Sequence, residues 1–452
     1  MFQQLLVANR GEIARRIIAV ARRMGLQTIA VYSDADEALP FVREADQAVR
    51  IGPPPAKDSY LNMAAVLEAA HRTGAEAIHP GYGFLSENAG FARACRDAGF
   101  IFVGPPAEAM ERMKDKSEAR RIVAGAGVPI VPGSAGILAD ARAAQAEAER
   151  IGFPVLCKAA GGGGGIGMAV ANDTAELEKA FRQCSDRARS AFGREGVYLE
   201  RYFPAPRHIE VQILGDHHGH TLHVLERECS IQRRHQKVVE EAPSPLFGDP
   251  DDGGHEGTRQ RLFDAALAAA RAFGYANAGT VEFLWADGAF YFIEMNARLQ
   301  VEHPITEVTT GVDLIGWQLR IAAGEKLALR QDELKRHGAA IEFRIYAEDP
   351  VRFLPSPGTI RTYRPPAGEG IRLDSGYAEG NAVTPHYDPM IAKLIVWGED
   401  RSQAIERSIR ALETFSIEGI KTNLPLHLRI LRDPAFQEGR VDTAFLEHHA
   451  KP

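Results

Sequence analysis

Short apolar segments alternate with amphipathic helical segments through the first hundred residues of this chain. Residues 3–8 (QQLLVA) and 28–32 (TIAVY) predict strands, and residues 13–21 between them have the apolar spacing of one helix face. A helix predicted over residues 60–73 leads to a further strand at 77–79. Strands that are joined by helices run parallel, so this order predicts a doubly wound α/β sheet at the N-terminus.

The turn after the first predicted strand argues against one obvious class of nucleotide-binding protein. It reads Asn9-Arg10-Gly11 and lacks the Gly-x-Gly-x-x-Gly pattern with which dinucleotide-binding domains hold pyrophosphate. A nucleotide-dependent oxidoreductase is therefore the weaker interpretation of this region.

The composition argues against several other classes of protein. At 452 residues, with 45% hydrophobic residues, the chain is long enough for several domains with ordinary cores. A net charge of −7 does not favour nucleic-acid binding, and no apolar run reaches the length of a membrane span. The four cysteines are scattered, and the N-terminus lacks the apolar core and cleavage site of a signal peptide. We therefore expect buried thiols in a cytoplasmic protein.

Five consecutive glycines at 161–165 form the most unusual stretch of the sequence. The apolar residues 153–157 precede them and residues 168–171 follow, so one strand enters the run and another leaves it. A flexible linker would continue into polar, low-complexity sequence instead. With Lys158 at its edge, the run indicates a phosphate flap in which backbone N–H groups face an anion. It is not a P-loop, because no Gly-Lys-Ser/Thr closes it.

Two further units are predicted beyond the N-terminal sheet. A helix over 114–126 leads into a compact unit at about 131–203, which resembles a small lid. Its predicted elements are a helix over 139–151, a strand over 154–158, the glycine loop, a strand over 168–171, a helix over 173–192 and a strand over 197–203. A third domain begins at about 335, with strands over 340–347, 359–364 and 389–397 and a helix over 401–414.

The stretch 280–302 (TVEFLWADGAFYFIEMNARLQVE) predicts a β-hairpin in which each strand carries one acid, Glu282 or Glu294. A two-residue Asp287-Gly288 turn would put the two acids on opposite faces. A three-residue loop that ends in left-handed Gly288 would put both on one face, within reach of one cation. Two carboxylates with oxygen-only ligands suit Mg²⁺ or Mn²⁺.

Polar residues continue along one side of the second strand. They are Glu294, Asn296, Arg298, Gln300 and Glu302, and they alternate with Met295, Ala297, Leu299 and Val301. The wet face of a half-buried strand is the usual cause of such a pattern. This face instead offers metal ligands, a bidentate donor and an acid, which favours a functional site.

A second charged cluster lies at 226–241 (ERECSIQRRHQKVVEE), where basic and acidic residues are mixed. By itself such a run is usually a solvated loop. However, residues 207–213 (RHIEVQI) before it predict a strand with one polar side. Residues 341–345 repeat that pattern with Arg344 outward, although an isolated arginine of this kind is usually just exposed.

Five motifs together resemble those of biotin carboxylase, the ATP-grasp component of biotin-dependent carboxylases. They are HPGYGFLSEN (79–88), KAAGGGGGIGM (158–168), RRHQKVVEEAP (233–243), FIEMNARLQVEHPITE (292–307) and YDPMIAKL (387–394). The resemblance runs in order from residue 3 to about 447. It implies an α/β fold (α+β overall) with a Rossmann-like domain at 1–113, an ATP-grasp domain at 114–330 with its lid at about 131–203, and a C-terminal domain at 331–447.

The resemblance also implies roles for individual residues. Those expected to contact the ATP phosphates are Lys116, Lys158, Gly164 and Gly165. The adenine side would be formed by Glu200, Arg201, Tyr202 and Phe203, with His208 and His235 nearby. The divalent metal would be held by Glu282, Glu294 and Asn296, the first two of which also belong to the ATP site. Bicarbonate would be bound by Lys237, Arg298, Gln300 and Val301. Glu302 would be the general base, and Arg344 would steady the biotin enolate.

The activity implied is the ATP- and bicarbonate-dependent carboxylation of biotin on a carrier protein, through carboxyphosphate. This is the first half-reaction of an acyl-CoA carboxylase of the acetyl-CoA type. The stretch 42–62 is most similar to the α-subunits of acyl-CoA carboxylases. The cofactors are ATP, Mg²⁺ or Mn²⁺, and biotin on its carrier. The partners are a biotin carboxyl carrier protein or domain, a carboxyltransferase subunit and a second copy of the chain in a homodimer, with no nucleic acid or membrane. The biotin attachment motif Ala-Met-Lys-Met is absent from these residues.

Two positions depart from the family's pattern. Ile166 stands in the glycine loop where the family usually has Lys or Arg, and Arg201 replaces the commoner lysine of the hinge. The alternatives to biotin carboxylase are another ATP-grasp ligase that forms a carboxylate or carbamate, and a nucleotide-binding subunit without turnover. The segment 300–303 and Arg344 disfavour the first, and the presence of Glu302, Lys237 and Arg344 disfavours the second.

Overall fold

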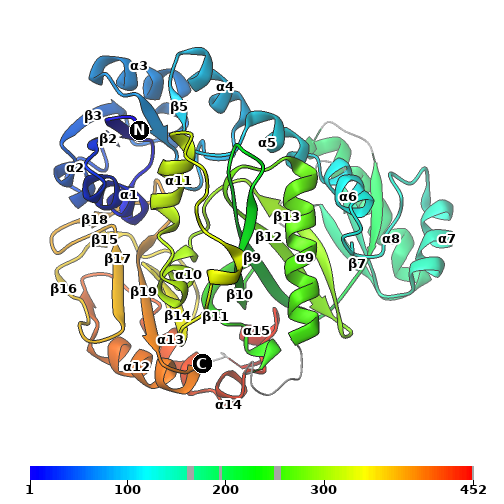
Figure 1. Cartoon of the computed structure of the whole chain (residues 1–452). Coiled ribbons are helices and arrows are strands. Elements are labelled where there is room, and N and C mark those ends of the chain that lie inside the picture. Colours follow the sequence, from blue (N-terminus) through cyan, green and yellow to red (C-terminus); the bar gives the residue numbers. More distant parts are fainter. Residues whose placement is uncertain (160–166, 193–195, 249–255, 450–452) are drawn as a thin grey trace.

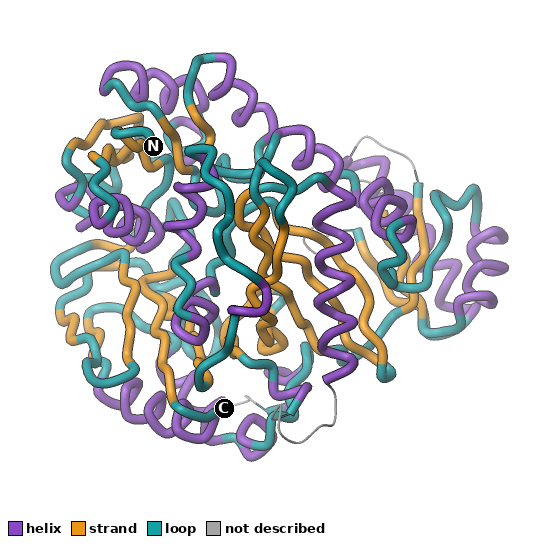
Figure 2. Tube along the Cα trace, viewed as in Figure 1, coloured by secondary structure: helices purple, strands orange, loops and turns teal. Residues whose placement is uncertain are grey.

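The computed structural model describes residues 1–159, 167–192, 196–248 and 256–449. A five-stranded sheet at the N-terminus lies against a central eight-stranded sheet, and a small lobe projects from one side of the molecule (Figure 1 and Figure 2). Gly164, Gly165 and Ile166 of the predicted phosphate flap lie outside the described residues.

The N-terminal sheet is parallel, as the alternation of strands and helices predicts. Its strands are β1 (Gln4–Val7), β2 (Gln27–Ser33), β3 (Gln47–Gly52), β4 (Ala77–His79) and β5 (Ile101–Phe102), and its helices are α1 (Gly11–Arg23), α2 (Pro40–Glu44), α3 (Met63–Thr73) and α4 (Ala89–Asp97). The strand order is β3-β2-β1-β4-β5. The central strand β1 is buried on both faces, and α1 buries Ile13, Ile17 and Ile18.

The helix predicted over 114–126 is α6 (Lys116–Gly125), which begins two residues later than expected. A separate helix, α5 (Ala107–Lys114), precedes it, with Asp115 between the two in an extended conformation. The Asp115 carboxylate accepts hydrogen bonds from the amides of Ser117 and Glu118, which makes it the N-cap of α6. This cap places Lys116 at the first position of a new helix.

The projecting lobe has the order of elements predicted for the lid. They are α7 (Ala141–Ile151), β6 (Val155–Ala159), β7 (Met168–Ala171), α8 (Thr174–Phe192) and β8 (Val197–Arg201). The sheet is antiparallel with the order β7-β6-β8, and its apolar core includes Val155, Cys157, Leu177 and Leu199. The strand predicted over 197–203 ends at Arg201.

The central sheet continues across residue 331, where the sequence predicts a domain boundary. Its strands are β9 (Arg207–Gly215), β10 (Thr221–Arg233), β11 (Gln236–Ala242), β12 (Asn277–Ala286), β13 (Ala289–Asn296), β14 (Ala339–Tyr346), β17 (Ile371–Ser375) and β19 (Met390–Gly398). The order is β13-β12-β9-β10-β11-β14-β19-β17, and every pairing is antiparallel.

Two helices of this region lie against different sides of the sheet. Helix α9 (Glu256–Phe273) packs its apolar residues against Ile209, Val211 and Ile213 of β9. The alternate residues of β9 are polar and face the opposite way, toward helix α10 (His303–Thr310). The polar face of the sheet therefore lies in the interior, and helix α11 (Leu314–Ala322) follows α10.

The C-terminal region adds helices α12 (Arg401–Thr414), α13 (Leu424–Arg432), α14 (Pro434–Gln437) and α15 (Phe445–His448). The strand predicted over 359–364 is two short strands, because β15 (Gly358–Thr359) pairs with β18 (Ala382–Val383) and β16 (Thr362–Arg364) pairs with β20 (Ser416–Glu418). Between them Ile360 is fully buried.

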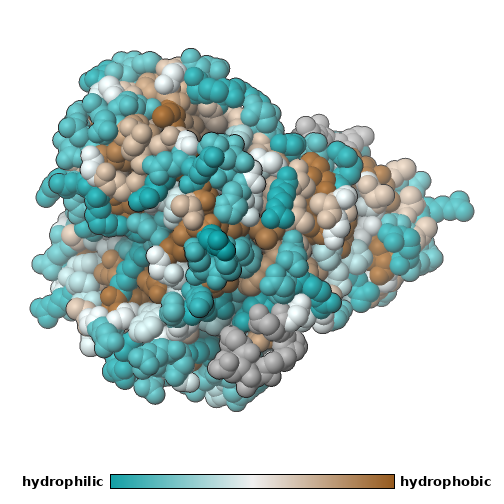
Figure 3. Space-filling model, viewed as in Figure 1, coloured by the Kyte–Doolittle hydropathy of each residue, from teal (hydrophilic) through white to brown (hydrophobic). Residues whose placement is uncertain are grey.

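Hydrophilic residues cover most of the face shown in Figure 3, with hydrophobic residues in scattered patches. Within the described residues no helix combines the length and the apolar character that a membrane crossing requires. All four cysteines are free thiols and buried, as the sequence predicts.

Candidate active site

A cavity of about 740 Å³ opens where the polar face of the central sheet meets the N-terminal sheet. Many of the residues predicted for the site line it: His208, His235, Lys237, Glu282, Glu294, Asn296, Arg298, Gln300, Val301 and Arg344. Glu302 is fully buried directly behind them. Segments that are far apart in the sequence thus meet at one place.

The β12–β13 hairpin brings Glu282 and Glu294 to one face, but not through the loop that the sequence suggested. The turn has two residues, Asp287 and Gly288, both with positive φ, and it pairs Ala286 with Ala289. That turn alone would separate the two acids. A β-bulge at Ile293 shifts the register by one residue, so that Glu282 lies directly opposite Glu294. The three-residue loop is therefore wrong, and the bulge produces the shared face.

The two acids differ in their surroundings. Glu282 Oε1 accepts hydrogen bonds from Lys237 Nζ at 2.8 Å, Asn296 Nδ2 at 2.9 Å and Gln300 Nε2 at 3.0 Å. Burial raises the pKa of Glu282, but Lys237 and His208 outweigh it and hold this pKa below its ordinary value. Glu294 is more exposed, and among the described residues its carboxylate accepts a hydrogen bond from Lys116, with Nζ 3.3 Å from Oε2.

Lys237 lies at the centre of a ring of carboxylates. Its Nζ donates to Glu210, to Glu282 and, at 2.7 Å, to Glu302. Burial lowers the pKa of Lys237, but the three carboxylates raise it well above its ordinary value. The ligand atoms of His208, Glu210 and Glu282 lie within 4.8 Å of one another, and the ammonium group of Lys237 donates to both carboxylates.

Glu302 is held between two cations. Besides Lys237, Arg344 Nη2 donates to its other oxygen at 3.0 Å. Burial raises the pKa of Glu302, but Lys237 and Arg344 lower it by more. This pKa therefore lies well below its ordinary value. Glu302 is thus an ionised carboxylate, the form in which it can accept a proton.

Arg298 lies in the segment that follows β13, and its guanidinium faces the side-chain amides of two neighbouring residues. Its Nη1 donates to Gln300 Oε1 at 2.8 Å and its Nη2 donates to Asn296 Oδ1 at 3.1 Å. The carbonyl oxygen of Val301 accepts a hydrogen bond from Lys393 Nζ at 2.7 Å. The planar guanidinium of Arg298, which can donate two parallel hydrogen bonds, therefore lies beside the amides of Asn296 and Gln300. This combination suits the binding of a small planar oxyanion.

Of the residues predicted for the ATP phosphates and adenine, Lys158 and the strand residues Glu200 and Arg201 belong to the lobe. The lining of the cavity, within the described residues, does not include Lys116, Lys158 or residues 200–203. Lys158 is hydrogen-bonded to Glu200, which also accepts from Arg120 at 2.9 Å, and Phe203 stacks on Tyr291 at 5.4 Å. Arg201 instead turns toward α7, where its guanidinium donates to the carbonyl of Ile151 at 3.3 Å.

The charged run 226–241 is not a solvated loop. It forms the β10–β11 hairpin, whose two-residue turn consists of Arg234 and His235, both with positive φ. Its acids are buried, and so is Arg227, whose guanidinium donates to Glu210, Gln212, Thr280 and Thr306. Paired charges can be buried in this way, because each one has a partner of opposite sign or a hydrogen bond.

Several cavity residues received no role from the sequence. Tyr82 and Glu87 come from the N-terminal domain and Asp388 from the C-terminal region, and all three line the cavity. Glu87 approaches Arg298 Nε at 3.5 Å. The motifs HPGYGFLSEN and YDPMIAKL contain these residues, so their presence in two separate motifs was the available signal.

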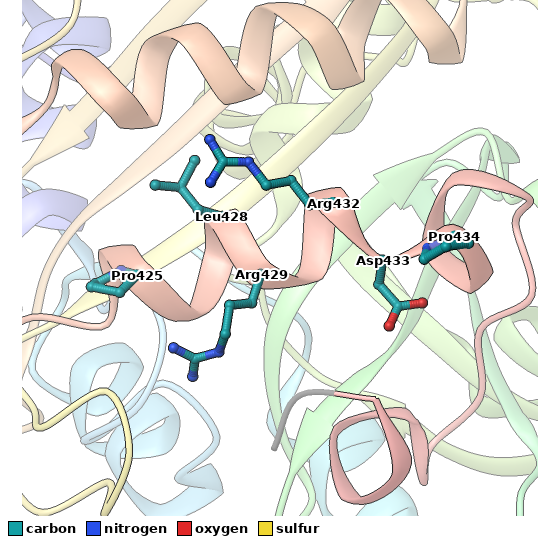
Figure 4. Close-up of a pocket in the computed structure, with 6 residues that line it drawn as sticks. All are labelled: Pro425, Leu428, Arg429, Arg432, Asp433 and Pro434. Carbon is teal, nitrogen blue, oxygen red and sulfur yellow. The ribbon is translucent and has the colours of Figure 1, made fainter. Parts of the chain in front are cut away.

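A second, separate pocket lies along helix α13 and the residues that follow it (Figure 4). It is lined by Pro425, Leu428, Arg429, Arg432, Asp433 and Pro434. Its charged side chains have structural partners, since Arg429 donates to the carbonyl of Pro350 and Asp433 caps α14. It shares no described residue with the predicted site.

Comparison with known proteins gives three matching families along the chain. Residues 1–110 match the biotin carboxylase N-terminal domain, residues 115–330 the carbamoyl-phosphate synthase L chain ATP-binding domain, and residues 342–448 the biotin carboxylase C-terminal domain.

Individual relatives agree with these matches. A biotin carboxylase of Halalkalibacterium halodurans is 53% identical over 100% of this chain and 98% of its own length. The mitochondrial methylcrotonoyl-CoA carboxylase subunit alpha of Arabidopsis thaliana is 50% identical over 99% of this chain, which spans 60% of that subunit. A solved structure, the biotin carboxylase domain dimer of Hydrogenobacter thermophilus 2-oxoglutarate carboxylase with MgADP, ADP and bicarbonate, matches with a TM-score of 0.91. It is 46% identical and covers 99% of this chain and 98% of that chain. The chain therefore belongs to the biotin carboxylase family and is an ATP-dependent ligase.

Proposed function

We propose that this protein carboxylates biotin on a carrier protein, using ATP and bicarbonate and passing through carboxyphosphate. The observation that carries the proposal is the position of Glu302, a buried carboxylate held between Lys237 and Arg344 at the edge of the cavity. These three residues together offer a base in Glu302, a cation for the bicarbonate oxyanion in Lys237 and a cation for the biotin enolate in Arg344.

Bicarbonate is a poor nucleophile, so a base has to remove its proton as it attacks the γ-phosphate of ATP. We assign Lys237, Arg298, Gln300 and Val301 to bicarbonate binding and Glu302 to proton removal. Lys237 Nζ donates a hydrogen bond to Glu302 Oε1. Bicarbonate bound beside Lys237 would therefore present its proton to the Glu302 carboxylate.

The metal set fits a hard divalent cation. Glu282 and Glu294 lie directly opposite each other, and Asn296 adds an amide oxygen in the same strand. We assign these three residues to Mg²⁺ or Mn²⁺, which when bound would offset negative charge on the phosphoryl groups. To bind the cation, Asn296 would give up the hydrogen bond that it accepts from Arg298. Glu282 would give up the hydrogen bonds that it accepts from Lys237, Asn296 and Gln300.

The remaining assignments concern ATP and biotin. We assign Lys116, Lys158, Gly164 and Gly165 to the phosphates, residues Glu200, Arg201, Tyr202 and Phe203 to the adenine side, and His208 and His235 to their vicinity. Carboxyphosphate releases CO₂, and the phosphate that remains can deprotonate the ureido nitrogen of biotin. The enolate-like oxygen then needs a fixed cation, which we assign to Arg344.

The partners follow from the same proposal. We expect a biotin carboxyl carrier protein or domain, a carboxyltransferase subunit, and a homodimer whose contacts leave the lid free to move. The relative from Hydrogenobacter thermophilus is described as a dimer, which supports this expectation. Sedimentation at micromolar concentration tests it, and a monomer would count against it.

The final carboxyl acceptor is the finer part of the proposal. We propose an acyl-CoA of the acetyl-CoA type, although the relatives also act in methylcrotonoyl-CoA and 2-oxoglutarate carboxylases. Identifying the carboxyltransferase that copurifies with this chain decides between these acceptors. The cytoplasmic location stays a prediction from the sequence.

The experiment for the core reaction measures ADP release with free biotin, bicarbonate and MgATP, omitting each in turn. We expect ADP release that requires both bicarbonate and biotin. ATP cleavage that needs a different acceptor would indicate another ATP-grasp ligase. Nucleotide binding without cleavage would indicate a non-catalytic subunit.

A further inference from the structure

Two buried glutamates lie side by side behind Arg344. Glu240 on β11 and Glu342 on β14 are direct partners across the antiparallel strands, and both are fully buried. Direct partners share one face of a sheet, with their Cβ atoms about 4.5–5.5 Å apart. Their carboxyl groups are therefore neighbours inside the protein.

Only one of the two is tied to a cation by a hydrogen bond. Arg344 Nε donates to Glu240 Oε1 at 2.6 Å. Within the described residues, Glu240 Oε2 and both carboxyl oxygens of Glu342 have no hydrogen-bond partner. Lys393, whose charge acts on Glu342, is engaged with the carbonyl of Val301 and with Glu12. No described residue thus donates a hydrogen bond to either oxygen of Glu342.

Two adjacent carboxylates in a dry interior cannot both stay ionised, because each disfavours the charge of the other. The titratable and charged groups that face the pair are Cys229 on β10, Lys237 on β11, Arg344 and Tyr346 on β14, Lys393 on β19 and Glu302 at the start of α10. Burial raises the pKa of Glu240 to about 7 and that of Glu342 well above its ordinary value. Of the two, Glu240 has the closer cation.

We propose that Glu240 and Glu342 share one proton, carried by Glu342, and that the Glu240 carboxylate is a positioning residue for the guanidinium of Arg344. The protonated Glu342 donates a hydrogen bond to Glu240 Oε2, and Glu240 Oε1 accepts from Arg344 Nε. This inference rests on the role proposed above for Arg344 toward biotin.

The arrangement has a consequence for the reaction. Arg344 is anchored at two nitrogens, Nε on Glu240 and Nη2 on Glu302. When Glu302 takes the proton of bicarbonate, its negative charge disappears and its hold on Arg344 weakens. Glu240 keeps its charge, because Glu342 already holds the proton of the pair. Arg344 therefore stays in place for the biotin step that follows.

Two isosteric variants separate the roles. In Glu342→Gln the amide replaces a neutral acid of the same shape and can still donate to Glu240. In Glu240→Gln the negative charge that holds Arg344 is lost. We expect Glu240→Gln to lower kcat/KM for free biotin by about 10- to 100-fold, the usual effect of losing a partner that orients a functional side chain. We expect Glu342→Gln to stay within about threefold of the wild type, and KM for ATP to remain unchanged in both.

A second readout does not depend on activity. Glu342 is protonated in the folded protein, whereas in the unfolded chain it ionises near pH 4.3. Its contribution to stability is complete below that pH and declines as the pH rises toward its native pKa. The Tm of the wild type should therefore fall relative to that of Glu342→Gln as the pH is raised from 6 to 8.5.

Three results would overturn the inference. Glu342→Gln could lose biotin turnover as severely as Glu240→Gln, the Tm difference could stay constant with pH, or Glu240→Gln could keep the biotin kinetics of the wild type. If Glu240→Gln does not fold, the pH dependence of Glu342→Gln still decides whether the proton is shared. A wild type without biotin-dependent ATP cleavage would instead contradict the proposed function.

Discussion

Glu282 and Glu294 face each other across one hairpin, but they belong to two different kinds of site. The Glu282 side chain is 8% exposed and hydrogen-bonded to Lys237, Asn296 and Gln300. The Glu294 side chain is 41% exposed and contacts Lys116, which is itself 50% exposed. The inner half of the cavity is thus assembled within the fold, whereas the outer half is open toward the lobe.

The difference follows from the energetics of charge. A buried charge has to be paired or hydrogen-bonded, so the inner acids and cations hold one another in fixed positions. Exposed ion pairs contribute little, and water screens them. We therefore expect the inner half to be organised before bicarbonate binds, and the outer half to gain order when MgATP binds. We expect substitutions in the inner half to affect chemistry most and those in the outer half to affect nucleotide affinity.

The largest effect is expected at Glu302. Glu302→Gln removes the proposed general base while keeping the shape of the side chain, and it should lower biotin-dependent ADP release by about 1,000-fold, within the range of a lost general base. The affinity for MgADP, measured by calorimetry, should remain close to that of the wild type. A loss of less than tenfold would assign the proton transfer to another group.

Arg344→Ala tests the second cation that contacts Glu302 in the inner half of the cavity. Loss of the cation that we assign to the enolate should lower biotin carboxylation by about 100-fold, because stabilisation of a developing oxyanion would be lost. Binding of ATP should persist, as judged by its Kd. If nucleotide affinity falls in parallel with turnover, the assignment of Arg344 to biotin is wrong.

The matched pair Glu282→Gln and Glu294→Gln tests the comparison most directly. Each should weaken activation by Mg²⁺ by about tenfold or more, since each removes one charged ligand. Only Glu282→Gln should also lower the free energy of unfolding, by about 1–3 kcal/mol, because it leaves Lys237 and His208 with one charged partner fewer. Denaturant titration of both variants measures this difference. Equal destabilisation would mean that the two acids are not energetically distinct.

The smallest effect concerns the glycine loop, where Gly165 and Ile166 lie outside the described residues. If the loop contacts ATP as proposed, Ile166→Arg adds a cation whose ion pair with phosphate contributes about 0.5–1 kcal/mol, as surface ion pairs do, and it should lower KM for ATP by about two- to fivefold. Gly165→Val should raise it, since a β-branched residue resists positive φ and blocks approach to phosphate. If neither variant changes KM or kcat, the loop does not contact the nucleotide.

Local patterns predicted the elements more reliably than their ends. The parallel N-terminal sheet, the order of elements in the lobe and the β12–β13 hairpin all follow from periodicity and turn residues. The break at Asp115 and the division of residues 358–364 between two sheets were not predicted. A side-chain cap causes the first, and a change of strand partner causes the second. Both depend on neighbours that periodicity does not reveal.

By itself the sequence determined the fold class and the residue types of the site, because strand and helix periods and the order of motifs are local properties. Only the tertiary structure decided where those residues lie relative to one another. The bulge at Ile293 puts Glu282 and Glu294 on one face, although the two-residue turn would separate them. Burial likewise turned charged residues such as Glu210, Arg227 and Glu342, which in sequence resemble solvated positions, into interior groups. The physical reason is that the free energy of a charge depends on all its neighbours in space, most of which are distant in sequence.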